Sequence, residues 1–184
     1  MKLYTRKGDE GESSLLFGGR ISKADPRCDA YGSIDEAVSA MGLGRSLCNN
    51  QEIKNILLTI QREMFIVGSE LATGPSEYNK LKQNFSVVTT DMVNALENLI
   101  DEISSQVELP PEFIVPGASP GSSAIDIART LVRKAERRVV ALNSQQKIQN
   151  PEILRYLNRL SDLLFILARF EDKNLPTEFA NNPI

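Results

Sequence analysis

The sequence predicts an all-α protein, an antiparallel bundle of five helices that follows an ordered N-terminal loop. Three observations support this fold class. Five segments of the 184-residue chain repeat apolar residues every three or four positions, the spacing that lines one face of a helix. Proline, glycine or a capping side chain bounds these segments, and no convincing pair of strands is visible between them. The length suits one hydrophobic core but not two, so residues 1–184 are expected to form a single domain.

The N-terminal 25 residues contain four glycines among charged and hydroxyl side chains, with too little apolar periodicity for a helix. They predict either an ordered loop or a disordered tail. The first helix is expected over residues 26–48, because Ile34, Val38 and Met41 share one face and a proline suits the first helical turn.

A broad apolar stripe predicts the second helix over residues 52–73, ending at Gly74-Pro75. Residues 74–88 are polar and contain proline, glycine and asparagine, so we expect a long, mobile connection there. Thr89 or Thr90 then caps a third helix, which ends before Pro110.

Two further helices complete the predicted bundle. The fourth spans residues 123–143, after a loop rich in glycine, proline and serine. The fifth has Asn150 as its N-cap and Pro151 as its first residue, and runs to about residue 173. The tail, residues 174–184, is expected to be loosely attached.

Composition disfavours several classes of function. The 21 basic and 24 acidic side chains give a net charge of −3, so neither nucleic acid nor a membrane is an expected partner. The absence of a long apolar run and of a secretory signal predicts a soluble, cytoplasmic protein, with an organelle as the alternative. Histidine, the usual general base and transition-metal ligand, is absent. Cys28 and Cys48 are expected to be reduced thiols.

Arginines recur on the predicted fourth helix. Arg129, Arg133 and Arg137 are four residues apart and therefore share a face. They form either a solvated surface paired with carboxylates or an anion site, since guanidinium groups hold phosphate through two parallel hydrogen bonds. The apolar face of the same helix is expected to lie in the core: Ile127, Leu131, Ala135, Val139 and Leu142.

Two other segments carry candidate ligand contacts. Residues 5–14, TRKGDEGESS, combine glycine, two cations and three hydroxyls, a composition suited to wrapping a polyphosphate, although the P-loop consensus is absent. A plain basic tail is the alternative. On the predicted fifth helix, Asn158 and Asp162 lie one turn apart and either contact a ligand or satisfy buried partners.

Six segments in the same order resemble the PduO-type ATP:cob(I)alamin adenosyltransferase family, and the resemblance extends over about residues 3–170. They are YTRKGDEGESS at 4–14, residues 20–23, AYGSIDE at 30–36, FIVPG at 113–117, ARTLVRKAERRVV at 128–140 and YLNRLSDLLF at 156–165. Each motif is modest alone, but their shared order is specific.

The resemblance implies transfer of the 5′-deoxyadenosyl group of ATP to the cobalt of cob(I)alamin, forming adenosylcobalamin and releasing triphosphate. The alternative is a non-catalytic helical module that senses or delivers a nucleotide or corrinoid. The family resemblance further implies a homotrimer with sites at the subunit interfaces, Mg²⁺ bound with ATP, and a cobalamin reductase as partner. No protein ligand of the metal can be named from the sequence.

The resemblance divides the chain into a nucleotide loop (1–25), the bundle (26–173) and the tail (174–184). Arg133 and Arg137 are implied to stabilise the leaving triphosphate, and Phe113 to occupy the space below the corrin. From the sequence alone, the alternative is that Phe113 is a core aromatic that leads into Ile114 and Val115. Asp35 and Arg129 are implied to form an intersubunit ion pair. The implied ATP-binding residues are Thr5, Arg6, Lys7, Gly8, Asp9, Ser13, Ser14, Lys23, Arg133, Glu136, Arg137 and Asn158.

The sequence departs from the family pattern at three places. Ala118 replaces a second glycine, Ile125-Asp126 replaces a leucine-histidine pair, and Lys134 replaces an arginine. Lysine keeps the charge but loses the bidentate geometry of arginine, so a weaker hold on phosphate is expected.

Overall fold

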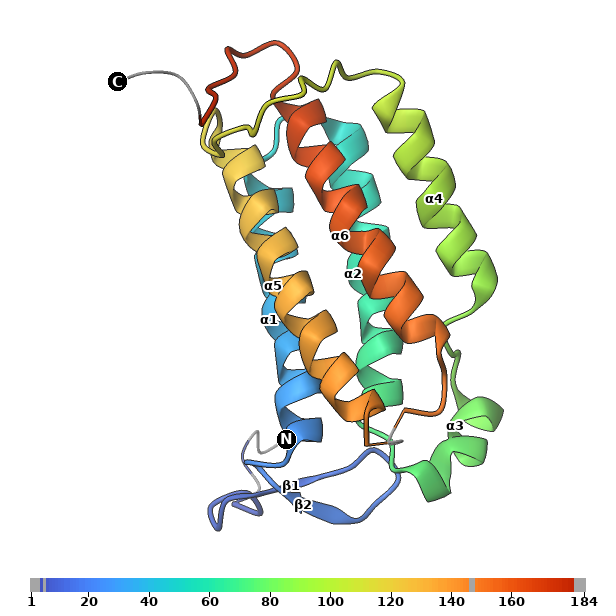
Figure 1. Ribbon diagram of the computed structural model, residues 1–184. Helices are drawn as coiled ribbons and strands as arrows, with labels where there is room; N and C mark the ends of the chain where they lie inside the picture. Colours follow the sequence, from blue (N-terminus) through green and yellow to red (C-terminus); the bar gives the residue numbers. More distant parts are fainter. Residues whose placement is uncertain (1–3, 5, 146–147, 181–184) are drawn as a thin grey trace.

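The computed structural model describes residues 4, 6–145 and 148–180, and confirms that the protein is mostly helical (Figure 1). No helix in these ranges is both long and apolar enough to cross a membrane. The elements are β1 (Glu12–Ser14), β2 (Arg20–Ser22), α1 (Pro26–Leu47), α2 (Gln51–Leu71), the 3₁₀ helix η1 (Pro75–Glu77), α3 (Tyr78–Asn84), α4 (Thr90–Ser104), α5 (Pro120–Asn143) and α6 (Glu152–Glu171).

The long helices begin where capping side chains predict them. Asp25 accepts a hydrogen bond from the amide of Arg27 at 2.8 Å, and Thr89 accepts one from that of Met92 at 3.3 Å. At the start of α5, Ser119 forms a capping box with Ser122, so the helix begins at Pro120, three residues before the predicted start.

The start of α6 differs slightly from the prediction. Asn150 accepts a hydrogen bond from the amide of Glu152 at 3.1 Å, as a capping residue does. The helix nevertheless begins at Glu152, and Pro151 precedes it.

The expectation that no strands pair is wrong. β1 and β2 form an antiparallel hairpin in which Ser13 lies opposite Ile21. Its turn contains Gly18 and Gly19, whose φ angles of 100° and 82° lie in the region that favours glycine. Three-residue strands are too short to show a recognisable alternation of apolar and polar residues, which explains why the sequence did not reveal them.

The expected mobile connection over residues 74–88 is also wrong in part, because it contains η1 and α3. Only Leu81 of α3 is buried, so this seven-residue helix has no apolar stripe to reveal it in the sequence. Contacts made with the rest of the protein hold it in place, as described below.

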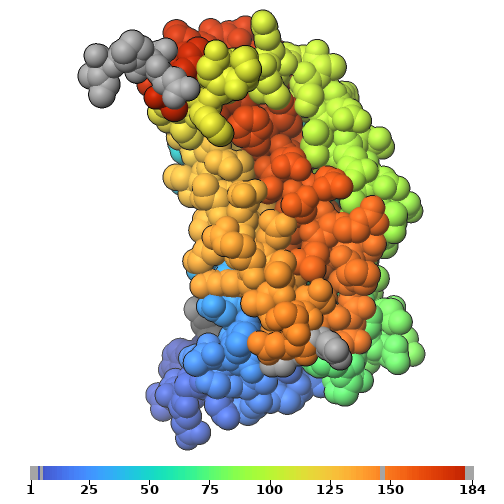
Figure 2. Space-filling view, viewed as in Figure 1, coloured from blue at the N-terminus to red at the C-terminus, as the bar shows by residue number. Residues whose placement is uncertain are grey.

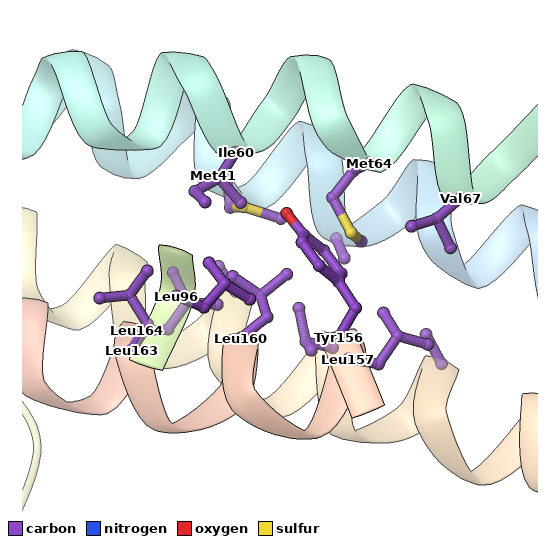
Figure 3. Packing of buried hydrophobic residues seen from close by; sticks show 14 of the residues in the cluster. Met41, Ile60, Met64, Val67, Leu96, Tyr156, Leu157, Leu160, Leu163 and Leu164 are labelled. Carbon is purple, nitrogen blue, oxygen red and sulfur yellow. The ribbon is translucent and has the colours of Figure 1, made fainter. Parts of the chain in front are cut away.

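The core lies among α1, α2, α5 and α6, and α4 packs on the outer side of α6 (Figure 1). Figure 3 shows the ring of Tyr156 reaching from α6 toward Met41 of α1 and Met64 of α2, and all three side chains are fully buried. The Tyr156 hydroxyl donates a hydrogen bond to Glu63 at 2.6 Å, and burial raises the pKa of this phenol well above its usual value.

The apolar stripe of α5 is mostly confirmed. Ala135, Val139 and Leu142 are buried and Leu131 is half-buried, but Ile127 is 53% exposed and the prediction that it lies in the core is wrong. Ile127 falls to one side of the buried stripe, and the helices that α5 mainly contacts within the described residues, α1 and α6, leave it uncovered.

The tail is attached over part of its length, contrary to expectation. The amide of Val115 donates to the carbonyl of Glu178, and that of Ala180 donates to the carbonyl of Phe113, both at 2.9 Å. Ile114 and Phe179 form an antiparallel bridge between these bonds. These pairings join residues more than 60 positions apart, which local sequence patterns do not report.

A buried carboxylate organises the end of the bundle that carries α3. Glu70 of α2 is 4% exposed and accepts hydrogen bonds from the Val88 amide at 2.6 Å, the Tyr78 hydroxyl at 2.8 Å and Asn150 Nδ2 at 3.0 Å. One side chain thus connects α2, α3, the segment before α4 and the start of α6. Burial, together with Glu70, raises the pKa of Tyr78, which keeps its hydroxyl a donor.

Replacing Glu70 by alanine is expected to destabilise the fold by about 3 kcal/mol, because it leaves the buried Val88 amide without its acceptor and removes one acceptor each from Tyr78 and Asn150. Urea denaturation followed by circular dichroism measures this loss. Glu102→Ala, at an exposed position of α4, should change the free energy of unfolding by less than about 0.5 kcal/mol. Equal stability of the two variants would contradict the role given to Glu70.

Candidate functional site

Three of the five cations between residues 129 and 138 are paired within the chain. Lys134 Nζ lies 2.7 Å from Glu36 Oε2, and Arg138 Nε lies 3.0 Å from Asp29 Oδ2, so both point toward α1. Arg129 pairs with Asp126, one turn earlier on α5. These three residues are paired with carboxylates, as the surface interpretation expects, but their side chains are half-buried and not fully solvated.

Arg133 and Arg137 differ from the other three. Both are exposed, and no acidic side chain among the described residues pairs with either. They lie one turn apart, so their guanidinium groups are available together for an anion. The anion-site reading fits this pair.

Polar partners next to these arginines come from α6. Asn158 Nδ2 donates to Glu136 Oε1 at 3.0 Å, and Asn158 Oδ1 accepts from Arg159 at 2.7 Å. The structure thus brings Glu136 and Asn158 together across the α5–α6 contact. Both side chains are half-buried, which limits their movement.

A cavity of about 250 Å³ lies between α4, α5 and α6. Its polar lining includes Arg129, Arg133 and Asp162, and its apolar lining includes Phe165 and Ile166. Asp162 is exposed whereas Asn158 is bonded within the bundle, so these two residues have different surroundings although they lie one turn apart. Figure 2 shows the surface of α5 and α6 as one continuous face bordered by α4.

The N-terminal segment is an ordered loop and not a free tail over its described residues. Lys23 Nζ donates to the carbonyl of Gly8, and the Lys23 amide donates to that of Gly11, both at 2.8 Å. Arg20 pairs with Glu12 at 2.8 Å and also donates to the carbonyl of Lys7. Glycine and lysine are therefore held close together, as a polyphosphate loop requires.

Other implied nucleotide residues lie along the same loop. Arg6 has a φ of 60°, a strained angle for a residue other than glycine, and its guanidinium lies 5.7 Å from the centre of the Tyr4 ring. Asp9 and Ser14 are exposed. Thr5 lies outside the described residues.

Tyr31 connects this loop to α1. Its hydroxyl donates to Ser13 Oγ at 3.1 Å and lies 2.9 Å from Cys28 Sγ. Burial raises the pKa of Tyr31, so its hydroxyl remains protonated. Periodicity alone did not single out this residue, because a half-buried tyrosine on a helix usually signals packing only.

Phe113 is 83% exposed, which overturns the reading of this residue as a core aromatic. The backbone pairing with residues 178–180 holds it in place. Ile114 and Val115, which follow it, line a cavity of about 650 Å³ between residues 106–118 and residues 169–179. Phe113 itself is not part of that lining.

A buried ion pair, missed in the sequence, lies near the start of α5. Asp126 (5% exposed) bonds Arg169 of α6 (7% exposed), and it also accepts a hydrogen bond from Arg129 Nε at 3.0 Å. The only sequence signal was an aspartate within an otherwise apolar turn. Asp35, the residue implied to pair with Arg129 of another subunit, is exposed on α1.

The described residues offer no ready metal centre. No group of three or more cysteine, aspartate or glutamate side chains gathers among them. Both cysteines are free thiols, and burial raises the pKa of Cys48 to about 12, which makes it a poor ligand and nucleophile.

Comparison with known proteins identifies the family. The family model for cobalamin adenosyltransferase matches residues 3–171. The corrinoid adenosyltransferase PduO of Salmonella typhimurium is 40% identical over 174 residues, which are 95% of this chain and 51% of that protein. The corrinoid adenosyltransferase of Citrobacter freundii is 37% identical over 171 residues, 93% of this chain and 95% of that protein. The chain thus spans about half the length of the first relative and nearly all of the second.

Solved structures agree with this assignment. A phenylalanine-to-alanine variant of the PduO-type ATP:corrinoid adenosyltransferase of Lactobacillus reuteri, complexed with cobalamin and ATP, has a TM-score of 0.88 and 34% identity, covering 98% of this chain and 100% of that chain. An arginine-to-lysine variant of that protein, complexed with ATP, has a TM-score of 0.86 and 33% identity, covering 97% and 100%. The chain belongs to the cobalamin adenosyltransferase family.

Proposed function

We propose that this chain transfers the 5′-deoxyadenosyl group of ATP to the cobalt of cob(I)alamin, forming adenosylcobalamin and releasing triphosphate. The observation that carries the proposal is the exposed, unpaired couple Arg133 and Arg137, because an anionic leaving group needs such a partner. The names of the relatives support the same reaction. A module that only bound a partner helix would need neither the glycine- and lysine-containing N-terminal loop nor the exposed Phe113.

ATP is the ligand of the N-terminal loop and of the arginine couple in this proposal. Lys7 and Lys23 contribute charge near the phosphates, and the loop amides contribute donors. Arg133 and Arg137 hold the triphosphate by bidentate hydrogen bonds. The remaining contacts are assigned to Thr5, Arg6, Gly8, Asp9, Ser13, Ser14, Glu136 and Asn158.

The reaction is a substitution at the 5′ carbon of ATP. A cobalt–carbon bond forms while the carbon–oxygen bond breaks, and the triphosphate leaves with the bonding electron pair. Cob(I)alamin is itself a strong nucleophile, so no enzymatic base is needed, which agrees with a chain that contains no histidine. The protein supplies alignment of the two substrates, exclusion of water and positive charge for the leaving group.

Magnesium is expected to arrive with ATP. Mg²⁺ usually keeps several waters and binds through substrate phosphates with one or two carboxylates. The described residues contain no carboxylate cluster, and Glu12 is engaged by Arg20. The chain therefore fits a phosphate-bound ion better than a resident metal centre, and we assign no protein ligand to it.

Phe113 is proposed to lie below the corrin ring. An apolar ring there would exclude water and the nucleotide base of the corrinoid from the lower face of cobalt. Loss of the axial ligand makes Co(II) easier to reduce, and a cobalamin reductase is the proposed electron donor. The neighbouring structures in which a phenylalanine and an arginine were varied support functional roles for these two residue types.

We infer that the complete site lies between subunits of a homotrimer. The hairpin and the Phe113 segment lie at opposite ends of α5, whose 24 residues span about 36 Å (Figure 1). Within one chain the hairpin and the Phe113 segment stay apart, whereas a neighbouring chain could place its own copy of one segment beside the other. Exposed apolar side chains of α1 and α5 are suited to such an interface: Leu43, Leu47, Ile127 and Val140.

Arg129 is proposed to pair with Asp35 across this subunit interface. Arg129 uses Nε to bond Asp126, which leaves its terminal nitrogens for Asp35 of a neighbouring subunit.

The bundle is assigned as five antiparallel helices, namely α1, α2, α4, α5 and α6, with α3 as an addition. A cytoplasmic location remains a prediction from the sequence.

Arg133→Ala is expected to lower turnover at limiting ATP about ten- to a hundredfold, since the loss of a charged hydrogen bond costs about 1.5 to 3 kcal/mol. An anaerobic assay that follows the formation of adenosylcobalamin from ATP and reduced cobalamin measures the change. Arg62→Ala, at an exposed position of α2, is the matched control and should react normally. Unchanged ATP dependence in folded Arg133→Ala protein would remove this residue from the site.

Phe113→Ala should leave folding and ATP binding nearly unchanged, because the ring is 83% exposed in the chain. It should abolish the four-coordinate Co(II) spectrum and adenosylation from Co(II), while pre-reduced Co(I) still reacts. Cobalt EPR and parallel thermal melts test this, with Phe65→Ala, 66% exposed on α2, as control. A four-coordinate signal that persists in Phe113→Ala would rule out the role below the corrin.

Asp35→Asn should weaken the trimer about tenfold or more, because it leaves Arg129 without its intersubunit partner. Sedimentation over a range of concentrations measures assembly, and Glu102→Gln is the control. Charge reversal of the pair is a poor test, since an aspartate at position 129 would face Asp126. A double-mutant cycle with Arg129→Gln is the better design. The interface proposal fails if the unaltered chain is monomeric.

A further inference from the structure

The tip of the β1–β2 hairpin is fastened to the residues around α3. The Leu16 amide donates to the carbonyl of Ala72 at 3.0 Å. The ring of Phe17 meets that of Phe85 edge-on, with centres 5.9 Å apart and an interplanar angle of 67°. Lys80 Nζ lies 5.1 Å from the centre of the Phe17 ring. Figure 1 shows the hairpin and α3 at the same end of the bundle.

α3 forms a fixed platform for these contacts although it is short. Its first residue, Tyr78, donates to the buried carboxylate of Glu70 at 2.8 Å, and Leu81 is fully buried. The Phe85 amide donates to the carbonyl of Leu81 at 2.8 Å, which ends the helix and orients the Phe85 backbone. The position of Phe85 is therefore set by the fold and not by the hairpin.

The hairpin needs such an attachment. Each strand has three residues, and a two-stranded hairpin of this size is marginally stable on its own. β1 contains Ser13 and Ser14, and Lys23 follows β2 directly. Movement of the tip would therefore shift the proposed nucleotide contacts at the other end of the hairpin.

We propose that Phe17 and Phe85, assisted by Lys80, form a clasp that positions the N-terminal loop for ATP. These are positioning residues, since they act through the hairpin and not on the substrate. The identity of the ligand rests on the proposed function above. The attachment of the hairpin itself rests only on the contacts within the chain.

The clasp predicts a selective effect on ATP. Phe17→Ala and Phe85→Ala should each raise the Kd and KM for ATP about three- to tenfold, the range expected for one aromatic pair. Turnover at saturating ATP and the KM for cob(I)alamin should stay near normal. The double variant should bind ATP no more weakly than either single variant. Phe85→Tyr, which keeps the aromatic ring, should bind ATP as tightly as wild type. Phe65→Ala is the control of equal size.

Tryptic cleavage after Arg20 and Lys23, measured without ATP, tests the attachment separately. The alanine variants should be cleaved several-fold faster there than wild type and Phe65→Ala. If wild type binds ATP while cleavage and ATP affinity are unchanged in Phe85→Ala, the clasp is overturned and the proposed function stands. If wild type binds no ATP, the proposed function and the nucleotide role of the clasp both fail. Faster cleavage of the alanine variants would in that case support only the attachment of the hairpin to the residues around α3.

Discussion

The length of α5 is the constraint on which the organisation of this protein depends. Its 24 residues extend for about 36 Å, with the Phe113 segment before its first turn and the N-terminal hairpin near its last. A rigid helix of this length cannot bring the two regions together within one chain. Phe113 and Ile127 are exposed in the single chain, and the proposed assembly of subunits would give both side chains a partner surface.

Pairing within the chain decides which cations remain available along this helix. Glu36 and Asp29 of α1 neutralise Lys134 and Arg138, and the buried Asp126 engages Arg129. Like charges at four-residue spacing repel one another, so an unpaired couple costs stability unless an anion joins it. Binding of a phosphate would relieve the repulsion between Arg133 and Arg137. The neighbouring cations Arg129, Lys134 and Arg138 are already neutralised by carboxylates of the chain. Lys134, which departs from the family pattern, points toward α1 and away from this couple.

Buried polar groups order the segments that lack a core of their own. Glu70 accepts hydrogen bonds from three separate segments, and Asp126 joins α5 to α6 through Arg169. Each carboxylate is satisfied by several donors, which offsets the cost of removing it from water. These contacts fix the surroundings of α3 at one end of the bundle and of residues 106–118 at the other. Short segments near the proposed site can thus be rigid with little apolar burial of their own.

The sequence by itself determined the long helices and the family. Apolar residues at three- to four-residue spacing and caps such as Asp25 and Thr89 are local features, so they located α1, α2 and α4 to α6 within a few residues except at the end of α4. The six motifs located most of the candidate site residues for the same reason. Only the tertiary structure decided the hairpin, α3, the pairing of residues 178–180, the exposure of Phe113 and Ile127, and the division of the α5 cations. The hairpin is local, but its three-residue strands are too short to show an alternating pattern. The other features depend on contacts between residues far apart in the chain or on which helix faces have a neighbour, and no local pattern carries that information.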